Sequence, residues 1–245
     1  MKDNNRTFGI EIEAYGVSRR ALTTALSQAG INIQNEAYNH NTRSYWKIVN
    51  DGSIRGIDGF ELVSPPLCGE AGLNEIRTVC RVLAQLGARV NKSCGLHVHH
   101  HAPDFKPRHF QNLVAFYTKA EDQIDRVMPN SRRASNNRYC GTMKRFNADR
   151  LFDNSRYHKL NLNSYYRYGT VEFRHHSGTI EADKIINWVE LTQRMVLRAK
   201  KRVTAYNGHS LTWYDVKQAL GLVHNPDNSD LRLARFYETR MAALA

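Results

Sequence analysis

The stretch Phe8–Ala14, which reads FGIEIEA, is the segment of this chain that decides its fold. Apolar and polar residues alternate along it, and this two-residue period is typical of a β-strand with one face in a core. The apolar side chains would enter that core together, so Glu11 and Glu13 would share the opposite face. Two carboxylates this close repel each other unless water, an arginine or a metal ion lies over them. An isolated pair favours a solvated strand face, so its meaning depends on matching groups elsewhere in the chain.

The size and composition of the chain are those of an ordinary folded soluble protein. Its 245 residues are 41% hydrophobic and 10% aromatic, which is enough for one substantial core in one or two domains. No stretch approaches the length of a membrane span, and Met1–Arg6 lacks the apolar core of a secretory signal. The four cysteines show no C-x-x-C spacing and are expected to be reduced thiols. We therefore expect a cytoplasmic protein.

The charge of the chain is strongly positive. The formal net charge is +12 and the isoelectric point is near 9.7, which favours acidic partners such as nucleotides, nucleic acid or an acidic polypeptide. The basic residues are concentrated in the stretch Arg132–Arg150, where arginines and lysines alternate with polar residues. A phosphate-binding loop and a solvated basic surface both fit this composition.

Helical and extended patterns are mixed along the chain. Apolar residues at helical spacing, ended by glycine or proline, predict helices over Ser18–Ala29, Leu73–Leu86, Arg108–Met128 and Ala182–Val203. Extended segments are predicted over Phe8–Ala14, Ile31–Tyr38, Tyr45–Asn50, Phe60–Val63, Ala88–His101, Tyr157–Tyr165 and Gly169–His176. The stretch up to Asn154 is expected to be irregular, and the part from Ser210 onward to be helical. Because several strands lie close enough in sequence to pair antiparallel, the pattern indicates an α+β fold.

Histidines are unusually dense in the segment Cys94–His101, which reads CGLHVHHH. In a strand, His97, His99 and His101 would project from one face, with Leu96, Val98 and His100 on the other. Neutral imidazole is a common metal ligand, so a His-x-His pair is a reasonable metal site. Three histidines could make a zinc site unaided, and that alternative stays open.

A carboxylate and a guanidinium alternate in the segment Gly169–His176, which reads GTVEFRHH. Strand geometry places Glu172, Arg174 and His176 on one face. Such neighbours are often a structural ion pair. Beside a phosphate and a metal ion, however, Glu172 would bind the cation and Arg174 would neutralise a phosphoryl or carboxylate group.

Two further acids lie in turn and strand segments. Asp51 stands in the turn NDGS, and Glu61 lies in a short apolar strand that prolines end. Together with the acids above, they outnumber the histidines, and an oxygen-rich set suits Mg²⁺ or Mn²⁺ better than zinc. Offsetting so many carboxylates would need more than one divalent ion, which indicates a multi-metal nucleotide site. No Walker-type loop and no G-x-G-x-x-G after a strand occurs, so the common nucleotide folds are not supported.

Five motifs follow one another along the chain: GIEIE, NDGS with ELVSP, CGLHVHH, YCGTMKRF and GTVEFRHHSGT. Their order resembles that of the amidoligase family, which comprises carboxylate–amine ligases of the glutamine synthetase and glutamate–cysteine ligase superfamily. The resemblance extends from about Phe8 to Trp188. It implies an α+β fold with a curved, largely antiparallel sheet and helices packed on one face. It also implies a catalytic domain over residues 1–205, with a helical extension over residues 206–245 packed on the same domain.

The resemblance assigns roles to residues by their position in these motifs. Ligands of two or three Mg²⁺ or Mn²⁺ ions would be Glu11, Glu13, Asp51, Glu61, His97 and Glu172. The phosphates of ATP would be bound by His97, Lys144, Arg145 and Arg174. Arg174 and Lys144 would also stabilise the transferred phosphoryl group, and His99 or His176 could take the proton of the attacking amine.

The reaction that the resemblance implies joins a carboxylate to an amine. A carboxylate is a poor acceptor because oxide cannot leave, whereas an acyl phosphate formed from ATP can release phosphate. Attack by the amine then gives an amide, ADP and phosphate. The implied partners are ATP, a carboxylate substrate and an amine substrate, of small-molecule, peptide or protein size, with no membrane involved.

Two other kinds of function compete with this hypothesis. A zinc hydrolase would use His97, His99 and His101, and it would need no ATP. A non-catalytic nucleic-acid-binding protein would use the Arg132–Arg150 stretch, and its binding would depend strongly on salt. The clustered acids disfavour both, because they would repel phosphate in the absence of a metal ion. The sequence names neither the substrates nor the oligomeric state.

Overall fold

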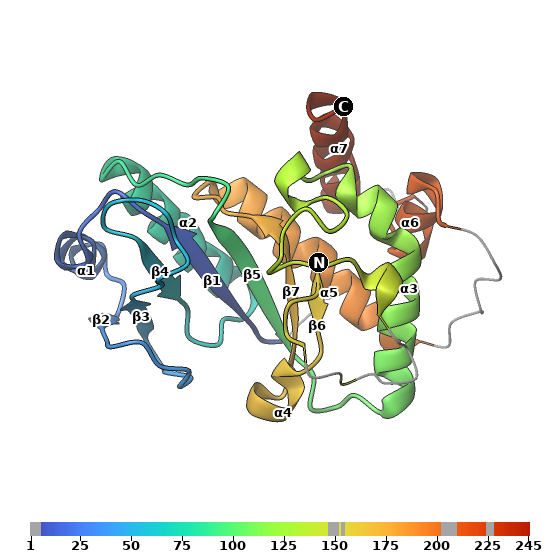
Figure 1. The fold of residues 1–245 in the computed structure, drawn as a ribbon, viewed down its shortest axis with the longest axis horizontal. Coiled ribbons are helices and arrows are strands. Elements are labelled where there is room, and N and C mark those ends of the chain that lie inside the picture. The colour runs from blue at the N-terminus through green and yellow to red at the C-terminus, as the bar shows by residue number, and fades with distance from the viewer. Residues whose placement is uncertain (1–5, 147–151, 153–154, 202–209, 224–227) are drawn as a thin grey trace. The chain divides into compact units, whose positions relative to one another are not determined.

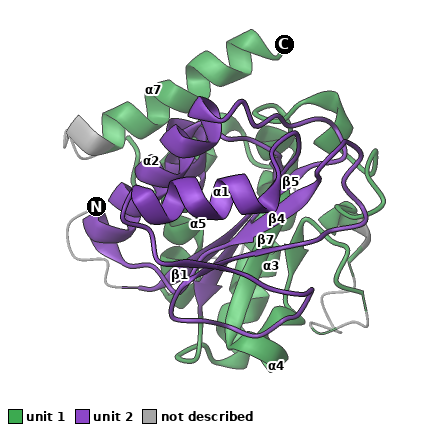
Figure 2. Ribbon diagram, turned by 90° about the vertical axis from the view of Figure 1, so that its left-hand side faces the viewer, with its two compact units in different colours: residues 1–3, 102–175, 189–245 green, residues 4–101, 176–188 purple. Residues whose placement is uncertain are grey.

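The structure, a computed structural model, describes residues 6–146, 152, 155–201, 210–223 and 228–245. Its contacts divide the chain into two compact units, which Figure 2 shows in two colours. Unit 2 comprises residues 4–101 and 176–188. Unit 1 comprises residues 1–3, 102–175 and 189–245. The predicted domain boundary between residues 205 and 206 lies outside the described residues, so that division stays a prediction.

Unit 2 is built on five strands (Figure 1). They are β1 (Phe8–Ala14), β2 (Ile33–Asn35), β3 (Trp46–Val49), β4 (Phe60–Val63) and β5 (Gly95–His101). Their order in the sheet is β2-β3-β4-β1-β5. The pairs β3–β4, β4–β1 and β1–β5 are antiparallel, and β2–β3 is parallel. The strand of the opening segment therefore has a hydrogen-bonded neighbour on each side, β4 and β5.

Two helices cover the apolar face of these strands. Helix α1 (Arg19–Gln28) begins at Ser18, whose hydroxyl accepts a hydrogen bond from the backbone of the first turn, as a good N-cap does. Helix α2 (Gly69–Gln85) packs buried apolar residues such as Val79 against the sheet. The indole Nε1 of Trp46 on β3 donates to Glu75 of α2 over 2.9 Å, which fixes α2 on this face. Ile10 and Ile12 of β1 are fully buried on the same side.

Unit 1 is mainly helical. Its helices are α3 (Pro107–Asp125), α4 (Ser164–Tyr168), α5 (Ala182–Lys200), α6 (Trp213–Ala219) and α7 (Asn228–Ala243), with short 3₁₀ turns over Asn130–Arg132 and Met143–Arg145. The strands β6 (Leu160–Asn161) and β7 (Thr170–Ser177) pair antiparallel. The end of β7 and the start of α5 belong to unit 2, so both elements run through both units.

A set of charged side chains is buried within unit 1. The ammonium group of Lys159, which is fully buried, lies 2.6 Å from Glu121 Oε1 and 2.5 Å from Asp125 Oδ1. His175 Nε2 lies 2.8 Å from the same Asp125 oxygen, and Tyr117 Oη lies 2.8 Å from His175 Nδ1. Burial is the main cause that lowers the pKa of His175 to about 4, so the ring is neutral. We call these five residues the buried cluster.

The fold class predicted from the sequence is confirmed. Strands and helices are mixed, and every strand pairing given above except β2–β3 is antiparallel. In the part of the chain that the structure describes, no helix is both long and apolar enough to span a bilayer.

Several predicted element boundaries are wrong. The strand expected over Ile31–Tyr38 is three residues long, because Glu36 and the polar residues after it bond to one another in a loop. The strand expected from Ala88 begins only at Gly95, and α2 begins four residues before Leu73. Part of Tyr157–Tyr165 belongs to the short helix α4, which Gly169 ends in the left-handed conformation. The predicted helix end at Val203 lies outside the described residues.

Candidate functional site

The register of the sheet gathers acidic side chains and histidines on one face of unit 2. Glu11 of β1 is the cross-strand partner of His97 on β5, and Glu13 is the partner of Glu61 on β4. Paired residues point to the same side of a sheet, and residues two apart on one strand do so as well. The face opposite the helices therefore carries Glu11, Glu13, Glu61, His97 and His99, which we call the acid–histidine face.

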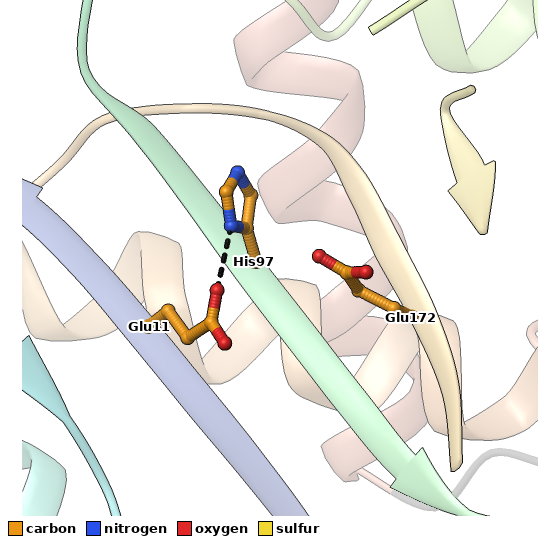
Figure 3. Close-up of side chains that lie close together, drawn as sticks. All are labelled: Glu11, His97 and Glu172. Carbon is orange, nitrogen blue, oxygen red and sulfur yellow. Dashed lines mark hydrogen bonds and ion pairs between the residues drawn. The ribbon is translucent and has the colours of Figure 1, made fainter. Parts of the chain in front are cut away.

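His97 lies between the two carboxylates of β1. Its Nδ1 is 2.8 Å from Glu11 Oε2, and Figure 3 shows this hydrogen bond together with the side chain of Glu172 from β7. An ionised carboxylate only accepts, so Nδ1 of a neutral His97 carries the proton and Nε2 carries the lone pair. Nε2 lies 3.7 Å from Glu13 Oε1. A histidine ligand held through its other nitrogen by a carboxylate is the arrangement that orients imidazole toward a metal ion.

Glu13, Glu61 and His97 form a group with the chemistry of a cation site. One ligand atom from each of the three lies within 4.8 Å of the others. Glu13 and His97 are buried, so their lone pairs converge in a place with little water. Two carboxylates and one imidazole are hard, mainly oxygen donors, a set that fits Mg²⁺ or Mn²⁺. Glu13 is itself positioned by the backbone N–H of Gly95, which donates to its Oε2 over 2.6 Å.

Glu11 is held in its ionised form. Burial alone would raise the pKa of this carboxyl, but hydrogen bonds from His97 and His99 keep its pKa well below the usual value. His99 Nε2 lies 3.3 Å from Glu11 Oε1, while His97 contacts the other oxygen. Glu11 therefore carries a negative charge at neutral pH and orients two imidazole rings at once.

In unit 1, Glu172 and Arg174 of β7 are side by side, as the sequence predicts for one strand face. Arg174 Nη1 lies 2.5 Å from Glu172 Oε1. The other oxygen, Oε2, accepts from the amide of Asn161 over 2.5 Å, and Asn161 is the cross-strand partner of Glu172. Glu172 is buried and Arg174 is partly exposed. An oriented carboxylate and a guanidinium of this kind can divide the binding of a cation and an anion between them.

Other residues predicted from the sequence stand in different surroundings. Asp51 Oδ1 accepts from the backbone N–H of Ser53 over 2.7 Å, which is a turn contact, and Asp51 does not belong to the group of Glu13, Glu61 and His97. Lys144 is exposed and lies 2.5 Å from Asp122. His176 is buried, contacts the Ser177 carbonyl and packs on Trp188.

The structure gives less information about two further predicted site residues, His101 and Arg145. His101 lies at the exposed end of β5, and among the described residues it belongs to no metal-compatible group of side chains. The side chain of Arg145 lies outside what the structure describes. A zinc site made of the three alternating histidines is therefore not assembled in the described part of the chain.

Two polar residues of these faces were not predicted from the sequence. Lys47 of β3 lies across from Val63 and shares the acid–histidine face, where its ammonium group donates to Asn39 and Asn41 of the adjoining loop. Asn161 orients Glu172, as described above. Each is a single polar residue inside an otherwise apolar strand, and that signal could have identified both.

Comparisons with known proteins give one family match and one structural match. The model of a family described as "Putative amidoligase enzyme" matches residues 4–151 and 142–196. A search of curated proteins gives no match. A solved structure titled "Crystal structure of novel glutamine synthase homolog" aligns with 98% of this chain at 14% identity and a TM-score of 0.45. This chain spans 66% of the length of that protein.

Proposed function

Since the chain belongs to the amidoligase family, which indicates a ligase, we propose that it is an ATP-dependent carboxylate–amine ligase. In this reaction a substrate carboxylate takes the terminal phosphoryl group of ATP and becomes an acyl phosphate. An amine then attacks the acyl carbon, phosphate leaves, and the amine loses a proton. The products are an amide, ADP and phosphate.

The observation that carries the proposal is the convergence of Glu13, Glu61 and His97 within 4.8 Å. A set of this kind has no use in a protein that only binds phosphate, because its charge repels phosphate unless a cation is present. We infer that these three residues would hold Mg²⁺ or Mn²⁺. The bound ion would supply positive charge to the phosphate oxygens of ATP.

The basic residues of unit 1 have a complementary part in the proposal. Arg174 would bind the transferred phosphoryl group through its planar fork of N–H donors. Its ion pair with Glu172 holds the guanidinium in one orientation, so little side-chain entropy is lost when the phosphoryl group binds. Lys144 would have to exchange Asp122 for phosphate, which an exposed ion pair allows at little cost. Glu172 is proposed to serve the same reaction as a metal ligand.

His99 is the residue we propose as the base for the amine. Its Nε2 lies 3.3 Å from Glu11 Oε1, so a proton taken up by the ring would be stabilised by an ionised carboxylate. Such a pairing raises the proton affinity of an imidazole and fixes its orientation. His176 is buried against Trp188, and these contacts favour a packing role for it.

ATP turnover with Mg²⁺, measured across pools of carboxylates and amines, tests the proposed function. The expected product has the mass of the two substrates less one water, and ADP appears with the same stoichiometry. Glu11→Gln and Glu172→Gln variants should lose this turnover, whereas Glu70→Gln, which changes an exposed acid of α2, should keep it. Turnover that survives both active-site substitutions contradicts the proposal, and so does stoichiometric zinc with activity that ignores Mg²⁺.

A further inference from the structure

Three arginines and two tyrosines gather on the part of unit 1 that carries Arg174. The guanidinium of Arg138 lies 4.6 Å from the ring centre of Tyr139, and that of Arg156 lies 5.2 Å from the ring centre of Tyr157. The two rings meet edge to face with their centres 5.5 Å apart. Arg174 Nε donates to the carbonyl of Tyr139 over 3.4 Å. We call these five residues the arginine–tyrosine patch.

Backbone hydrogen bonds hold the segments of this patch together. Gly141 N–H donates to the carbonyl of Tyr157 over 2.7 Å, and Lys159 N–H donates back to the carbonyl of Gly141 over 2.9 Å. Arg174 N–H in turn donates to the carbonyl of Lys159 over 2.9 Å. Lys159, whose backbone takes part in these hydrogen bonds, also carries the ammonium group of the buried cluster. The side chains of the patch are thus presented by a fixed backbone, which lowers the entropic cost of binding a ligand.

The positive charge of the patch converges on one hydroxyl group. Arg156 donates a hydrogen bond to the hydroxyl of Tyr157 over 3.3 Å. That hydrogen bond is the main cause that lowers the pKa of Tyr157, and the charges of Arg174 and Arg138 act in the same direction. Arg156 thus contacts this hydroxyl directly, while Arg138 and Arg174 contact Tyr139, whose ring packs against that of Tyr157. Arg138, Arg156 and Tyr157 are exposed, so a ligand can reach them.

The ring geometry indicates which kind of anion would fit. An arginine already covers one face of each tyrosine, and the edge-to-face contact occupies more of the ring surface. A nucleobase that stacked on either of these covered faces would have to displace an arginine. The N–H edges of the guanidinium groups and the tyrosine hydroxyls, by contrast, are donors that suit carboxylate oxygens.

We propose that Arg138, Arg156 and Arg174 bind an acidic, peptide-like substrate that carries more than one carboxylate. This inference rests on the proposed ligase function, in which the carboxylate to be activated lies at Arg174. A second carboxylate of the same molecule then binds Arg138 and Arg156. The strongly basic composition of the chain agrees with an acidic substrate of this kind.

The test is fluorescence anisotropy with a labelled tetraglutamate peptide and the full-length protein, at about 0.15 M salt and without ATP or divalent ions. An Arg138→Gln/Arg156→Gln double variant should weaken binding by roughly tenfold or more, since charge-assisted hydrogen bonds are lost. Lysine at both positions should restore part of the affinity, because charge returns without the planar fork. The matched control Arg126→Gln removes an exposed arginine at the end of α3 and should bind as the parent does.

Several results would overturn the inference. The parent could fail to bind the peptide, bind a neutral tetraglutamine peptide equally well, or lose the same affinity in the Arg126→Gln control. Tighter binding of a four-nucleotide single-stranded DNA through the same arginines would indicate a nucleic-acid surface instead. A double variant that loses ATP affinity and keeps peptide affinity would assign the patch to the nucleotide. Because peptide binding is measured without ATP, its outcome is separate from the turnover that tests the ligase function.

Discussion

The acid–histidine face of unit 2 and the buried cluster of unit 1 are built from similar residues but differ in their charge balance. In the buried cluster, Lys159 lies within 2.6 Å of one carboxylate and 2.5 Å of another, and its histidine is neutral. On the acid–histidine face, the contacts of Glu11 and Glu13 described above are to imidazole rings and one backbone N–H. Removing one partner of a charge pair buried inside the protein destabilises the fold, whereas carboxylates that converge with a lone pair suit a cation from outside.

The largest expected effect is a loss of stability in the buried cluster. Lys159→Met would leave Glu121 and Asp125 buried without their cation, and breaking a buried pair in this way costs about 3–5 kcal/mol of unfolding free energy. Urea denaturation measures the change. Lys144→Met is the matched control, because its pair with Asp122 is exposed and should contribute about 1 kcal/mol or less. Equal losses in the two variants would erase the contrast between the regions.

The next effect concerns the acid–histidine face, and it is one of activity. Glu13→Gln keeps the shape of the side chain but removes a charge from the metal-compatible group, so Mg²⁺-dependent ATP turnover should fall by about 100-fold. The unfolding free energy should stay within about 0.5 kcal/mol of the parent or rise, since repulsion between carboxylates is relieved. A variant that unfolds easily while its remaining folded fraction turns over ATP normally would assign Glu13 to the fold alone.

The pH dependence of the free energy of unfolding should report on His175 of the buried cluster. The pKa of His175 is lowered to about 4, mainly by burial. Below about pH 6.5 this histidine is therefore protonated in the unfolded chain but stays neutral in the folded protein. The contribution of His175 to the free energy of unfolding is therefore fully present above pH 6.5. It falls by about 1.4 kcal/mol per pH unit as the pH drops toward 4. Urea titrations across this range should show a shallower slope in His175→Gln. An unchanged slope would mean that His175 is not the group responsible.

The smallest effect expected is that of one neutral hydrogen bond. Tyr117→Phe removes the hydroxyl that lies 2.8 Å from His175 Nδ1, and the expected loss is about 1 kcal/mol. The midpoint of thermal unfolding measures it, with Tyr214→Phe as the control because that tyrosine is exposed on α6. A loss as large as that in Lys159→Met would show that the hydroxyl, rather than the ion pairs, organises the cluster.

The contrast also explains what the sequence could predict. The two faces of β1 follow from a two-residue period within seven residues, so the apolar face and the shared face of Glu11 and Glu13 are local properties. The pairing of Glu13 with Glu61 depends on the register of β4 against β1, which no short segment contains. The buried cluster was not predicted, because Lys159 lies more than thirty residues from either of its acids along the chain. Local periodicity predicted the faces, and long-range pairing determined the sites.

The errors in the predicted elements have the same origin. The segment Tyr157–Tyr165 is rich in tyrosine and leucine and predicts a strand, yet ring contacts of Tyr165 and Tyr166 with Phe152 and Phe110 accompany a short helix there. Tertiary packing outweighs local propensity in a segment this short. The roles of Glu172 and Arg174 as ligands of a metal ion and a phosphoryl group remain a proposal, for which their ion pair and the resemblance give support.

The most direct test of the central claim is the binding of Mn²⁺, followed by electron paramagnetic resonance with a non-hydrolysable ATP analogue present. The acid–histidine face predicts that the parent binds Mn²⁺ and that Mg²⁺ competes for the same site. Glu13→Gln and Glu61→Gln should each weaken Mn²⁺ binding by roughly tenfold or more, while Glu70→Gln, on the exposed side of α2, should bind Mn²⁺ like the parent. Mn²⁺ binding that is the same in all four proteins would contradict the claim.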